Sequence, residues 1–227
     1  MRFHSILFDL DGTLSESAPG LTKSVQYALQ QQKIEEPDLN ELLSFIGPPL
    51  SVEFRRKYGM SDACIEKAVL DFRVRYNRIG LFETNLYPGT DRMLQALHDA
   101  GLKMAVATGK PTDMAVRVLD YLKISQYFDG VFGPPMDVAD DVKTKSGADS
   151  KQTVIRNALA FLGADKDPAH CAMVGDRCFD IEGALKTGTV PVGVDFGYGT
   201  HEELLEAGCP EERIASSMEE LTEILLA

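Results

Sequence analysis

The chain has 227 residues, of which 44% are hydrophobic and 26% are charged. That length holds one substantial core, or a core domain together with a smaller one, and the composition is typical of a folded protein. The formal net charge of −12 argues against nonspecific binding to nucleic acid or to an anionic membrane. It also means that a site for an anionic ligand needs local cations of its own, either basic side chains or a metal ion.

Two further classes are disfavoured by the sequence. No stretch approaches the roughly 20 consecutive apolar residues of a membrane span, and the acidic residue at position 9 comes too early for a secretory signal. The cysteines lack the CxxC spacing of a metal finger; they are Cys64, Cys171, Cys178 and Cys209. Because scattered free thiols are typical of a reducing compartment, we expect a cytoplasmic protein.

The first apolar run, residues 6–8, predicts a short buried strand that leads directly into the string DLDGT at residues 9–13. Two acids spaced by two could by themselves be a solvated turn. The apolar strand before them and the Gly-Thr pair after them make a functional site the better interpretation. Gly12 lets the backbone approach a bound ligand closely, since a side chain there would intrude.

Residues 17–81 follow a different pattern from the rest of the chain. They predict helices without a convincing strand, at residues 21–32, 38–46, 51–58 and 61–76. We therefore expect an all-helical cap domain, residues 17–81, inserted into a core domain formed by residues 1–16 and 82–227. A cap placed there overhangs the carboxyl ends of the strands, where ligands bind in open α/β sheets.

From about residue 88 onward, strand and helix patterns alternate. Short apolar runs predict buried parallel strands at residues 103–107, 128–132, 171–174 and 190–194. Helical periodicity predicts helices at residues 90–100, 112–122 and 151–162. This alternation is typical of an α/β fold with a doubly wound parallel sheet.

The string at residues 9–13 resembles the first motif of the haloacid dehalogenase superfamily. The tail at residues 192–204 is similar to the phosphoglycolate phosphatase-like branch of that superfamily, whose members carry a helical cap between the first two motifs. The resemblance covers nearly the whole chain. It implies a Rossmann-like core, a helical cap and phosphatase activity.

Asp9 and Asp11 take distinct roles in this resemblance. Asp9 would be the nucleophile that attacks phosphorus and forms an aspartyl-phosphate. Asp11 would protonate the leaving oxygen and then deprotonate the attacking water.

The resemblance also implies a hydroxyl group after the next core strand, and Thr108 followed by Gly109 fits. The Thr108 hydroxyl and the neighbouring amides would bind a phosphoryl oxygen. Taken alone, a threonine in this position is often only a helix N-cap. The pair Gly109-Lys110 does not complete a Walker A motif, because no glycine lies five residues before Gly109.

A lysine that neutralises the phosphoryl group is the third implied feature. The candidates are Lys143, Lys145 and Lys151. Lys151 opens a predicted helix in a context similar to that of the superfamily lysine, whereas the other two lie in a loop-like polar stretch. We therefore assign this role to Lys151.

The fourth implied feature is the acidic pair in the string GDRCFD at residues 175–180. Asp176 would bind Mg²⁺ together with Asp9 and the backbone carbonyl of Asp11, and Asp180 would orient the ion or its waters from nearby. Ligands that are all oxygen suit Mg²⁺ better than zinc. The metal and the lysine would also supply the cations that the negative chain needs.

The sequence therefore predicts a Mg²⁺-dependent phosphatase for a small phosphorylated metabolite or nucleotide. Phosphoglycolate and nucleoside 5′-monophosphates are alternative substrates. A β-phosphoglucomutase-like phosphomutase is a second enzyme class, disfavoured because such mutases usually carry another residue at Thr13. A phosphorylated signalling receiver is a third class, disfavoured by the helical insertion and by the acidic pair.

Residues of the cap are expected to select the substrate. The loop Gly47-Pro48-Pro49 is the candidate specificity segment, and Arg55 and Arg56 are candidate anion contacts. A simple helix break and solvated arginines are equally good interpretations. The sequence fixes neither the substrate nor the oligomeric state, nor how far the cap moves.

Overall fold

The structure is a computed structural model of the chain and describes residues 2–135 and 147–227. Within these ranges, six strands form a sheet in the order β5-β4-β1-β6-β7-β8, and every neighbouring pair is parallel. The strands are β1 (Ser5–Phe8), β4 (Lys103–Ala107), β5 (Gly130–Phe132), β6 (Cys171–Gly175), β7 (Val190–Val194) and β8 (Ile214–Ala215). The central strand β1 therefore lies between β4 and β6.

Strand β1 is buried on both faces because its side chains alternate between two apolar clusters. Ile6 and Phe8 belong to the larger cluster and Leu7 to the smaller one. The larger cluster contains side chains of α4 (Thr90–Asp99), α5 (Thr112–Tyr121) and α10 (Met218–Leu226). The smaller cluster contains side chains of α7 (Gly147–Leu162) and α8 (Cys178–Thr187).

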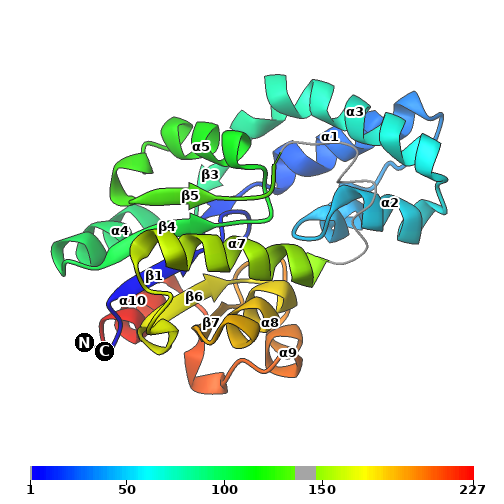
Figure 1. Cartoon of the computed structure of the whole chain (residues 1–227). Coiled ribbons are helices and arrows are strands. Elements are labelled where there is room, and N and C mark those ends of the chain that lie inside the picture. The colour runs from blue at the N-terminus through cyan, green and yellow to red at the C-terminus, as the bar shows by residue number, and fades with distance from the viewer. Residues whose placement is uncertain (1, 136–146) are drawn as a thin grey trace.

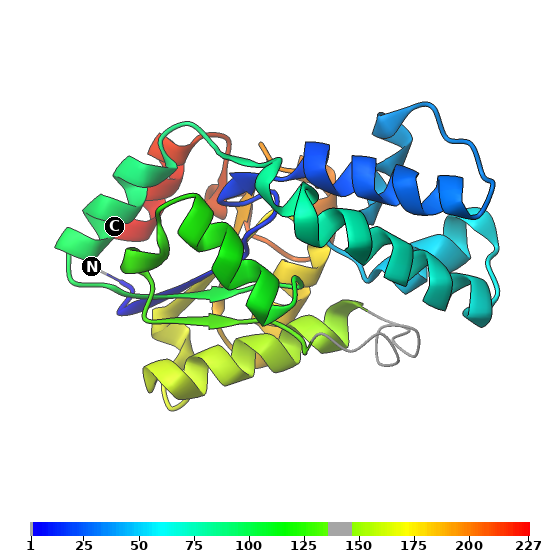
Figure 2. The ribbon, with the colours of Figure 1, turned by 90° about the horizontal axis from the view of Figure 1, so that it is seen from above.

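Helices thus cover both faces of the sheet, as Figures 1 and 2 show. The predicted doubly wound α/β fold is confirmed. Helix α9 packs against α8 through Leu204 and Ile181. The remaining short elements of this part are α9 (His201–Glu206), η3 (Ser125–Tyr127), η4 (Pro168–His170) and η5 (Glu211–Arg213).

The helical segment that follows β1 lies beside the sheet, on the right in Figures 1 and 2. Its elements are α1 (Ala18–Gln31), η1 (Leu39–Phe45), α2 (Leu50–Tyr58), α3 (Asp62–Arg78) and η2 (Gly80–Phe82). One expectation differs in type, because residues 39–45 form a 3₁₀-helix rather than an α-helix. Asp38 caps this short helix by accepting a hydrogen bond from the amide of Asn40.

A two-stranded antiparallel pair ties the start of the helical segment to its end. Strand β2 (Ser15–Glu16) pairs with β3 (Asn85–Leu86). Close packing continues next to this pair, where a Cβ on Gly20 of α1 would lie 2.0 Å from the carbonyl oxygen of Gly80. The chain therefore leaves the sheet and returns to it at one place.

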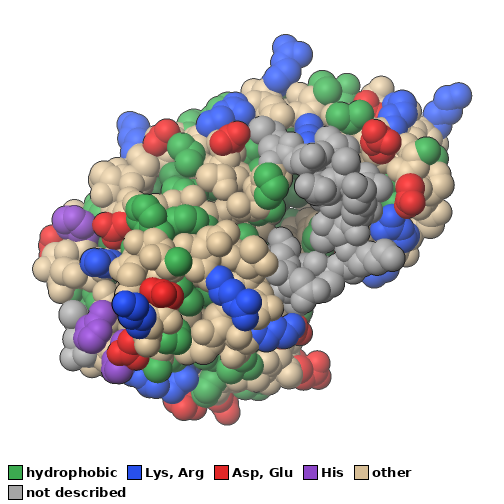
Figure 3. Space-filling view, in the orientation of Figure 1, with side chains coloured by type: hydrophobic (Ala, Val, Ile, Leu, Met, Phe, Trp, Pro, Cys, Tyr) green, Lys and Arg blue, Asp and Glu red, His purple; other side chains and the backbone are tan. Residues whose placement is uncertain are grey.

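Two observations concern the outer surface. In the part of the chain that the structure describes, no helix has both the length and the apolar character that crossing a membrane requires. On the face shown in Figure 3, acidic and basic side chains are interspersed.

Candidate active site

The carboxyl ends of three neighbouring strands bring the site together. Phe8 of β1 lies in register with Val106 of β4 and Val174 of β6. The residues that follow these strands therefore meet at one edge of the sheet, which is where Asp9, Thr108 and Asp176 stand in the chain.

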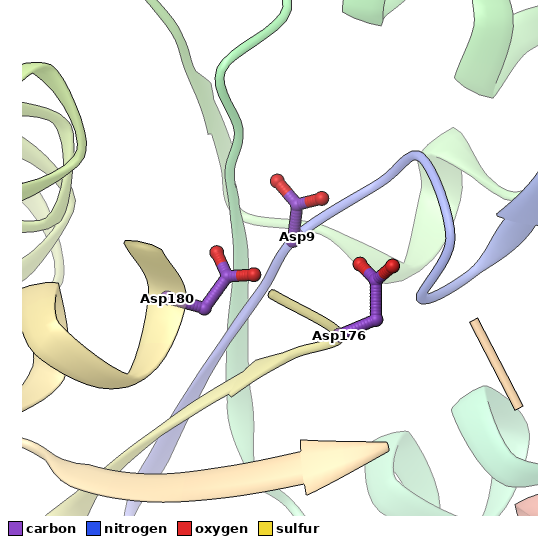
Figure 4. Close-up of side chains that lie close together, drawn as sticks. All are labelled: Asp9, Asp176 and Asp180. Carbon is purple, nitrogen blue, oxygen red and sulfur yellow. The ribbon is translucent and has the colours of Figure 1, made fainter. Parts of the chain in front are cut away.

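Three buried carboxylates form the centre of the site. Oxygen atoms of Asp9, Asp176 and Asp180 all lie within 4.8 Å of one another, and Figure 4 shows the three side chains gathered above the ends of β1 and β6. Asp180 comes from the first turn of α8 and accepts a hydrogen bond from the amide of Arg177 at 3.1 Å. The helix start thus holds Asp180 in place.

Lys151 of α7 neutralises part of this charge. Its Nζ lies 2.5 Å from Oδ1 of Asp9 and 2.6 Å from Oδ1 of Asp180. Burial alone would lower the pKa of Lys151, but the two carboxylates raise it above the ordinary lysine value. The structure thus brings Lys151 to Asp9; Lys143 and Lys145, the alternatives, lie outside the described residues.

The carboxylates still outnumber the cation among them. Burial raises the pKa of Asp9 to about 6, with Lys151 acting against this shift and Asp180 adding to it. Burial likewise raises the pKa of Asp176 well above its ordinary value, helped by Asp180 and Asp9. Both raised pKa values mean that the buried negative charge of the carboxylates is only partly neutralised. Three carboxylates this close together fit a hard cation such as Mg²⁺.

Asp176 is held by neighbours on both of its oxygens. The hydroxyl of Thr13 donates to Oδ1 at 3.2 Å, and the amide of Tyr198 donates to Oδ2 at 2.8 Å. Gly12 has a φ of +91°, and a Cβ there would lie 2.2 Å from Oδ2 of Asp176. Only glycine allows the loop of residues 9–13 to approach this carboxylate so closely.

Thr108 and Gly109 line the same pocket as Asp9. Thr108 is buried, and its hydroxyl accepts a hydrogen bond from the amide of Lys110 at 3.1 Å. A Cβ on Gly109 would lie 3.3 Å from the carbonyl oxygen of Gly47, so the loop of residues 47–49 in the helical segment reaches this turn.

Lys110 is a pocket residue to which the sequence assigned no role. Its Nζ lies 2.7 Å from Oδ2 of Asp11 and 2.5 Å from the hydroxyl of Tyr76. Burial would lower the pKa of Lys110, but Asp11 and Tyr76 raise it above the ordinary lysine value. The only signal in the sequence was the string TGK at residues 108–110, which does not complete a Walker A motif.

The pocket extends from the carboxylates to the helical segment. Its wall there is largely apolar and includes Leu21, Phe45, Pro48, Leu50, Phe72 and Met114. Arg73 of α3 also lines the pocket. A ligand that reaches from the carboxylates into this space would therefore meet mainly apolar side chains.

The residues of the helical segment that the sequence suggested as substrate contacts lie in different places relative to the pocket. Residues 47–49 line the pocket, as the specificity hypothesis requires. Arg55 and Arg56 are not among the lining residues, because Arg55 pairs with Asp62 at 2.7 Å and Arg56 pairs with Glu53 at 2.5 Å. The structure therefore does not bring these two arginines to the pocket wall, and their contact with a substrate stays a prediction.

The sequence of this chain also matches a known protein family. A family model described as haloacid dehalogenase-like hydrolase matches residues 6–194. The chain belongs to the haloacid dehalogenase-like hydrolase family. The resemblance stated from the motif at residues 9–13 is thereby confirmed, as is the prediction that the protein is an enzyme.

Curated relatives of this hydrolase carry several activities in their names. A 5′-nucleotidase of Pseudomonas aeruginosa is 37% identical over 90% of this chain and 88% of its own. The tyrosine-protein kinase PtkA of Mycobacterium tuberculosis is 32% identical over 97% and 72%. A phosphoglycolate phosphatase of Salmonella typhimurium is 29% identical over 89% and 85%.

Solved structures agree with the fold of this hydrolase. A predicted phosphatase from Clostridium acetobutylicum superimposes with a TM-score of 0.88 and 36% identity. The match covers 99% of this chain and 98% of the other. The whole architecture, helical segment included, is therefore shared.

Proposed function

We propose that this hydrolase is a Mg²⁺-dependent phosphatase in which Asp9 is the nucleophile. The observation that carries the proposal is the meeting of five side chains from four distant segments at one edge of the sheet. They are Asp9, Asp11, Thr108, Lys151 and Asp176. Family membership supports phosphatase chemistry, and the geometry supports the role of each residue.

The reaction would proceed in two steps. Asp9 attacks phosphorus, the bond from phosphorus to the leaving oxygen breaks, and Asp11 gives its proton to that oxygen. Water then attacks the phosphoryl group on Asp9, and Asp11 takes a proton from the water. The bond between phosphorus and Asp9 breaks, which releases phosphate and restores the Asp9 carboxylate.

Two residues would hold the phosphoryl group during both steps. Thr108 would donate its hydroxyl hydrogen to a phosphoryl oxygen, aided by the amide of Gly109. Lys151, which already contacts Asp9, would offset the negative charge as the nucleophile and the phosphate approach each other. The distance of 2.5 Å between Lys151 Nζ and Asp9 Oδ1 supports this assignment.

A metal ion would be held by the carboxylates of Asp9 and Asp176 and by the backbone carbonyl of Asp11, with Asp180 nearby. When bound, Mg²⁺ supplies positive charge to the carboxylates and to the phosphate oxygens. The raised pKa values of Asp9 and Asp176 support the need for that charge.

We further propose that residues 17–81 act as a cap domain that selects the leaving group. The loop of residues 47–49 forms part of the pocket wall, and α3 contributes Phe72, Arg73 and Tyr76. The antiparallel pair of β2 and β3, where the segment leaves and rejoins the core, is the natural hinge.

Among substrates, the apolar wall favours a nucleoside 5′-monophosphate over phosphoglycolate. A nucleobase offers a flat apolar face for Phe72 and its neighbours, whereas the carboxylate of phosphoglycolate needs cations. The relative named 5′-nucleotidase agrees with this ranking. Phosphoglycolate stays the alternative, supported by the relative of that name.

A cytoplasmic location completes the proposal. The four cysteines are free, and Cys171 and Cys209 are buried as thiols. Buried unpaired thiols are typical of a reducing compartment.

Phosphate release from a panel of monoesters tests the function. The panel contains nucleoside 5′-monophosphates, phosphoglycolate and a hexose 1-phosphate, each with Mg²⁺ and with a chelator. We expect Mg²⁺-dependent release that is fastest for a nucleotide. Isomerisation of the hexose phosphate without release would instead indicate a phosphomutase, and no release from any substrate would refute the proposal.

A further inference from the structure

Lys110 places a buried positive charge between the catalytic loop and the cap. Its side chain is 4% exposed. The ammonium contacts Oδ2 of Asp11 on one side and the hydroxyl of Tyr76 on the other, and it also lies 4.9 Å from the centre of the Tyr76 ring. Lys110 follows β4 in the core, whereas Tyr76 belongs to α3 of the helical segment.

The two oxygens of Asp11 have different surroundings. Oδ2 accepts from Lys110 at 2.7 Å. Oδ1 is buried, and among the described residues it has no hydrogen-bond partner. A buried oxygen without a partner is costly unless a ligand supplies one, so Oδ1 is the atom left for the reacting groups.

We propose that Lys110 is a positioning residue that fixes the Asp11 carboxyl group, so that Oδ1 faces the leaving oxygen, and that Tyr76 makes this orientation depend on the cap. The inference rests on the proposed function, since it assumes that Asp11 transfers the proton. Lys110 itself makes and breaks no bond in the reaction.

Tyr76 is well placed to couple the cap to Asp11. Its ring is buried and stacks on Phe72, with the ring centres 4.9 Å apart. Both side chains line the pocket and move with α3. A cap that moves away takes the Tyr76 hydroxyl from Lys110, which frees the ammonium to turn and loosens its hold on Asp11.

The turn that contains Lys110 also connects the positioning of Asp11 to phosphate binding. The amide of Lys110 donates to the hydroxyl of Thr108 at 3.1 Å. The backbone of residues 108–110 therefore sets the phosphate-binding hydroxyl, while the side chain of Lys110 sets Asp11. One short turn thus orients both sides of the phosphorus–oxygen bond that breaks.

The test uses leaving groups of graded acidity, because protonation by Asp11 matters most for a poor leaving group. Phenyl phosphate and p-nitrophenyl phosphate have nearly the same shape, but p-nitrophenolate leaves readily without a proton. The variant Lys110→Met keeps the unbranched apolar stem and removes the charge. Values of kcat/KM are measured for both esters with the full chain and Mg²⁺.

We expect Lys110→Met to lower kcat/KM for phenyl phosphate about tenfold more than for p-nitrophenyl phosphate, a fraction of the effect of a general acid. Lys110→Arg should recover part of the loss, because it restores a cation beside Asp11. Tyr76→Phe should widen the ratio between the two esters by a smaller factor. Tyr58→Phe, in the same segment but bonded to Glu36, is the control and should leave the ratio unchanged.

An equal loss with both esters would overturn the inference, since a structural or phosphate-binding role gives that result. Thermal unfolding of each variant shows whether the protein still folds. If Lys110→Met does not fold, the ratio for Lys110→Arg and Tyr76→Phe decides, and an unchanged ratio in both rejects the inference. If the wild type releases phosphate neither from these esters nor from any member of the monoester panel, the proposed function fails; a normal wild type with an unchanged ratio defeats the inference alone.

Discussion

Asp9 combines features that a surface aspartate lacks. It is buried at the end of the central strand, Lys151 touches one of its oxygens, and burial raises its pKa to about 6. A carboxylate is a weak nucleophile in water, where solvation stabilises its charge. In the proposed site, the nearby lysine and a phosphate bound next to Asp9 would make an attack on phosphorus feasible.

The variant Asp9→Asn tests this role. We expect kcat for p-nitrophenyl phosphate to fall by at least roughly 1,000-fold, because the amide cannot form the phosphorylated intermediate. The melting temperature should stay within a few degrees of the wild type, since Lys151 keeps its contact with Asp180. Asp99→Asn, an exposed change on α4, is the matched control, and substantial activity in Asp9→Asn would mean that another group is the nucleophile.

Among single residues of the site, the sequence predicted those that lie in local motifs. Asp9, Thr108, Lys151 and Asp176 were each named from a string of a few residues, and they meet in the structure. Tyr76 and Arg73 were missed because their roles depend on which face of α3 turns toward the core, and that is a tertiary property. Lys110 was missed for the same reason, since its partners come from residues 34 positions away or more.

Among the elements, the loop of residues 47–49 lies against Arg177 at the start of α8. The guanidinium of Arg177 donates to the carbonyl of Ile46 and pairs with Glu203 at 2.9 Å. Gly47 has a φ of +103°, and a Cβ there would lie 3.2 Å from Nη1 of Arg177. The loop is thus held against the core by one arginine.

The variant Gly47→Ala should raise KM several-fold, because the new Cβ pushes the loop away from Arg177 and out of the pocket wall. Gly59→Ala is a matched control, since Gly59 also has a positive φ, +60°, but no atom lies within 4 Å of its would-be Cβ. Both variants should lose about 1 kcal/mol of stability from backbone strain. Steady-state kinetics measure the change in KM, and thermal unfolding measures the loss of stability. Equal KM values for Gly47→Ala and Gly59→Ala would contradict this role of the loop.

Glu83 connects the two long helices of the segment to the strand that returns to the core. It accepts from Arg75 of α3 at 2.8 Å and from Lys23 of α1 at 3.2 Å. Hydrogen bonding from Arg75 lowers the pKa of Glu83 below its ordinary value, with Lys23 adding to the shift. The stability that it contributes is therefore present above the ordinary glutamate pKa and is lost as the pH falls through the lowered pKa.

We expect Glu83→Gln to lower the free energy of unfolding by about 0.5–1 kcal/mol at pH 7, a small value because the pair is partly exposed. The difference from the wild type should be complete above the ordinary glutamate pKa and should shrink as the pH falls through the lowered pKa of Glu83, because the wild-type carboxylate is then protonated too. Urea unfolding at several pH values measures this. Glu66→Gln, on the exposed side of α3, should show no difference, and a constant effect of Glu83→Gln at all pH values would exclude the ion pairs as its cause.

Element types were predicted where a pattern spans enough residues. The apolar runs predicted β1, β4, β6 and β7, and helical periodicity predicted α3, because each signal is local and repeated. Strands β2, β3 and β8 have two residues each, too few for any period. Tertiary partners define them.

In the whole molecule, the site lies where the two parts of the chain meet. The core supplies the carboxylates, Lys110 and Lys151, and the helical segment supplies most of the apolar wall. The net charge of −12 led us to expect local cations, and the structure brings these two buried lysines to the carboxylates. The distances and the pocket shape could not be predicted, because they depend on how segments more than 100 residues apart pack.

Mg²⁺ should stabilise the folded protein, because the three carboxylates repel one another in its absence. At 100 times its dissociation constant, an ion that binds only the folded state adds about 2.7 kcal/mol, which corresponds to roughly 5–10 °C in melting temperature for a chain of this size. Asp176→Asn removes the negative charge of one proposed ligand and should abolish most of this shift, whereas Asp99→Asn should keep it. Thermal unfolding across a Mg²⁺ titration measures both, and this readout does not depend on knowing the substrate. An unchanged titration in Asp176→Asn would show that the ion binds elsewhere, since the negative charge of a ligand cannot be removed without weakening the binding of a divalent cation.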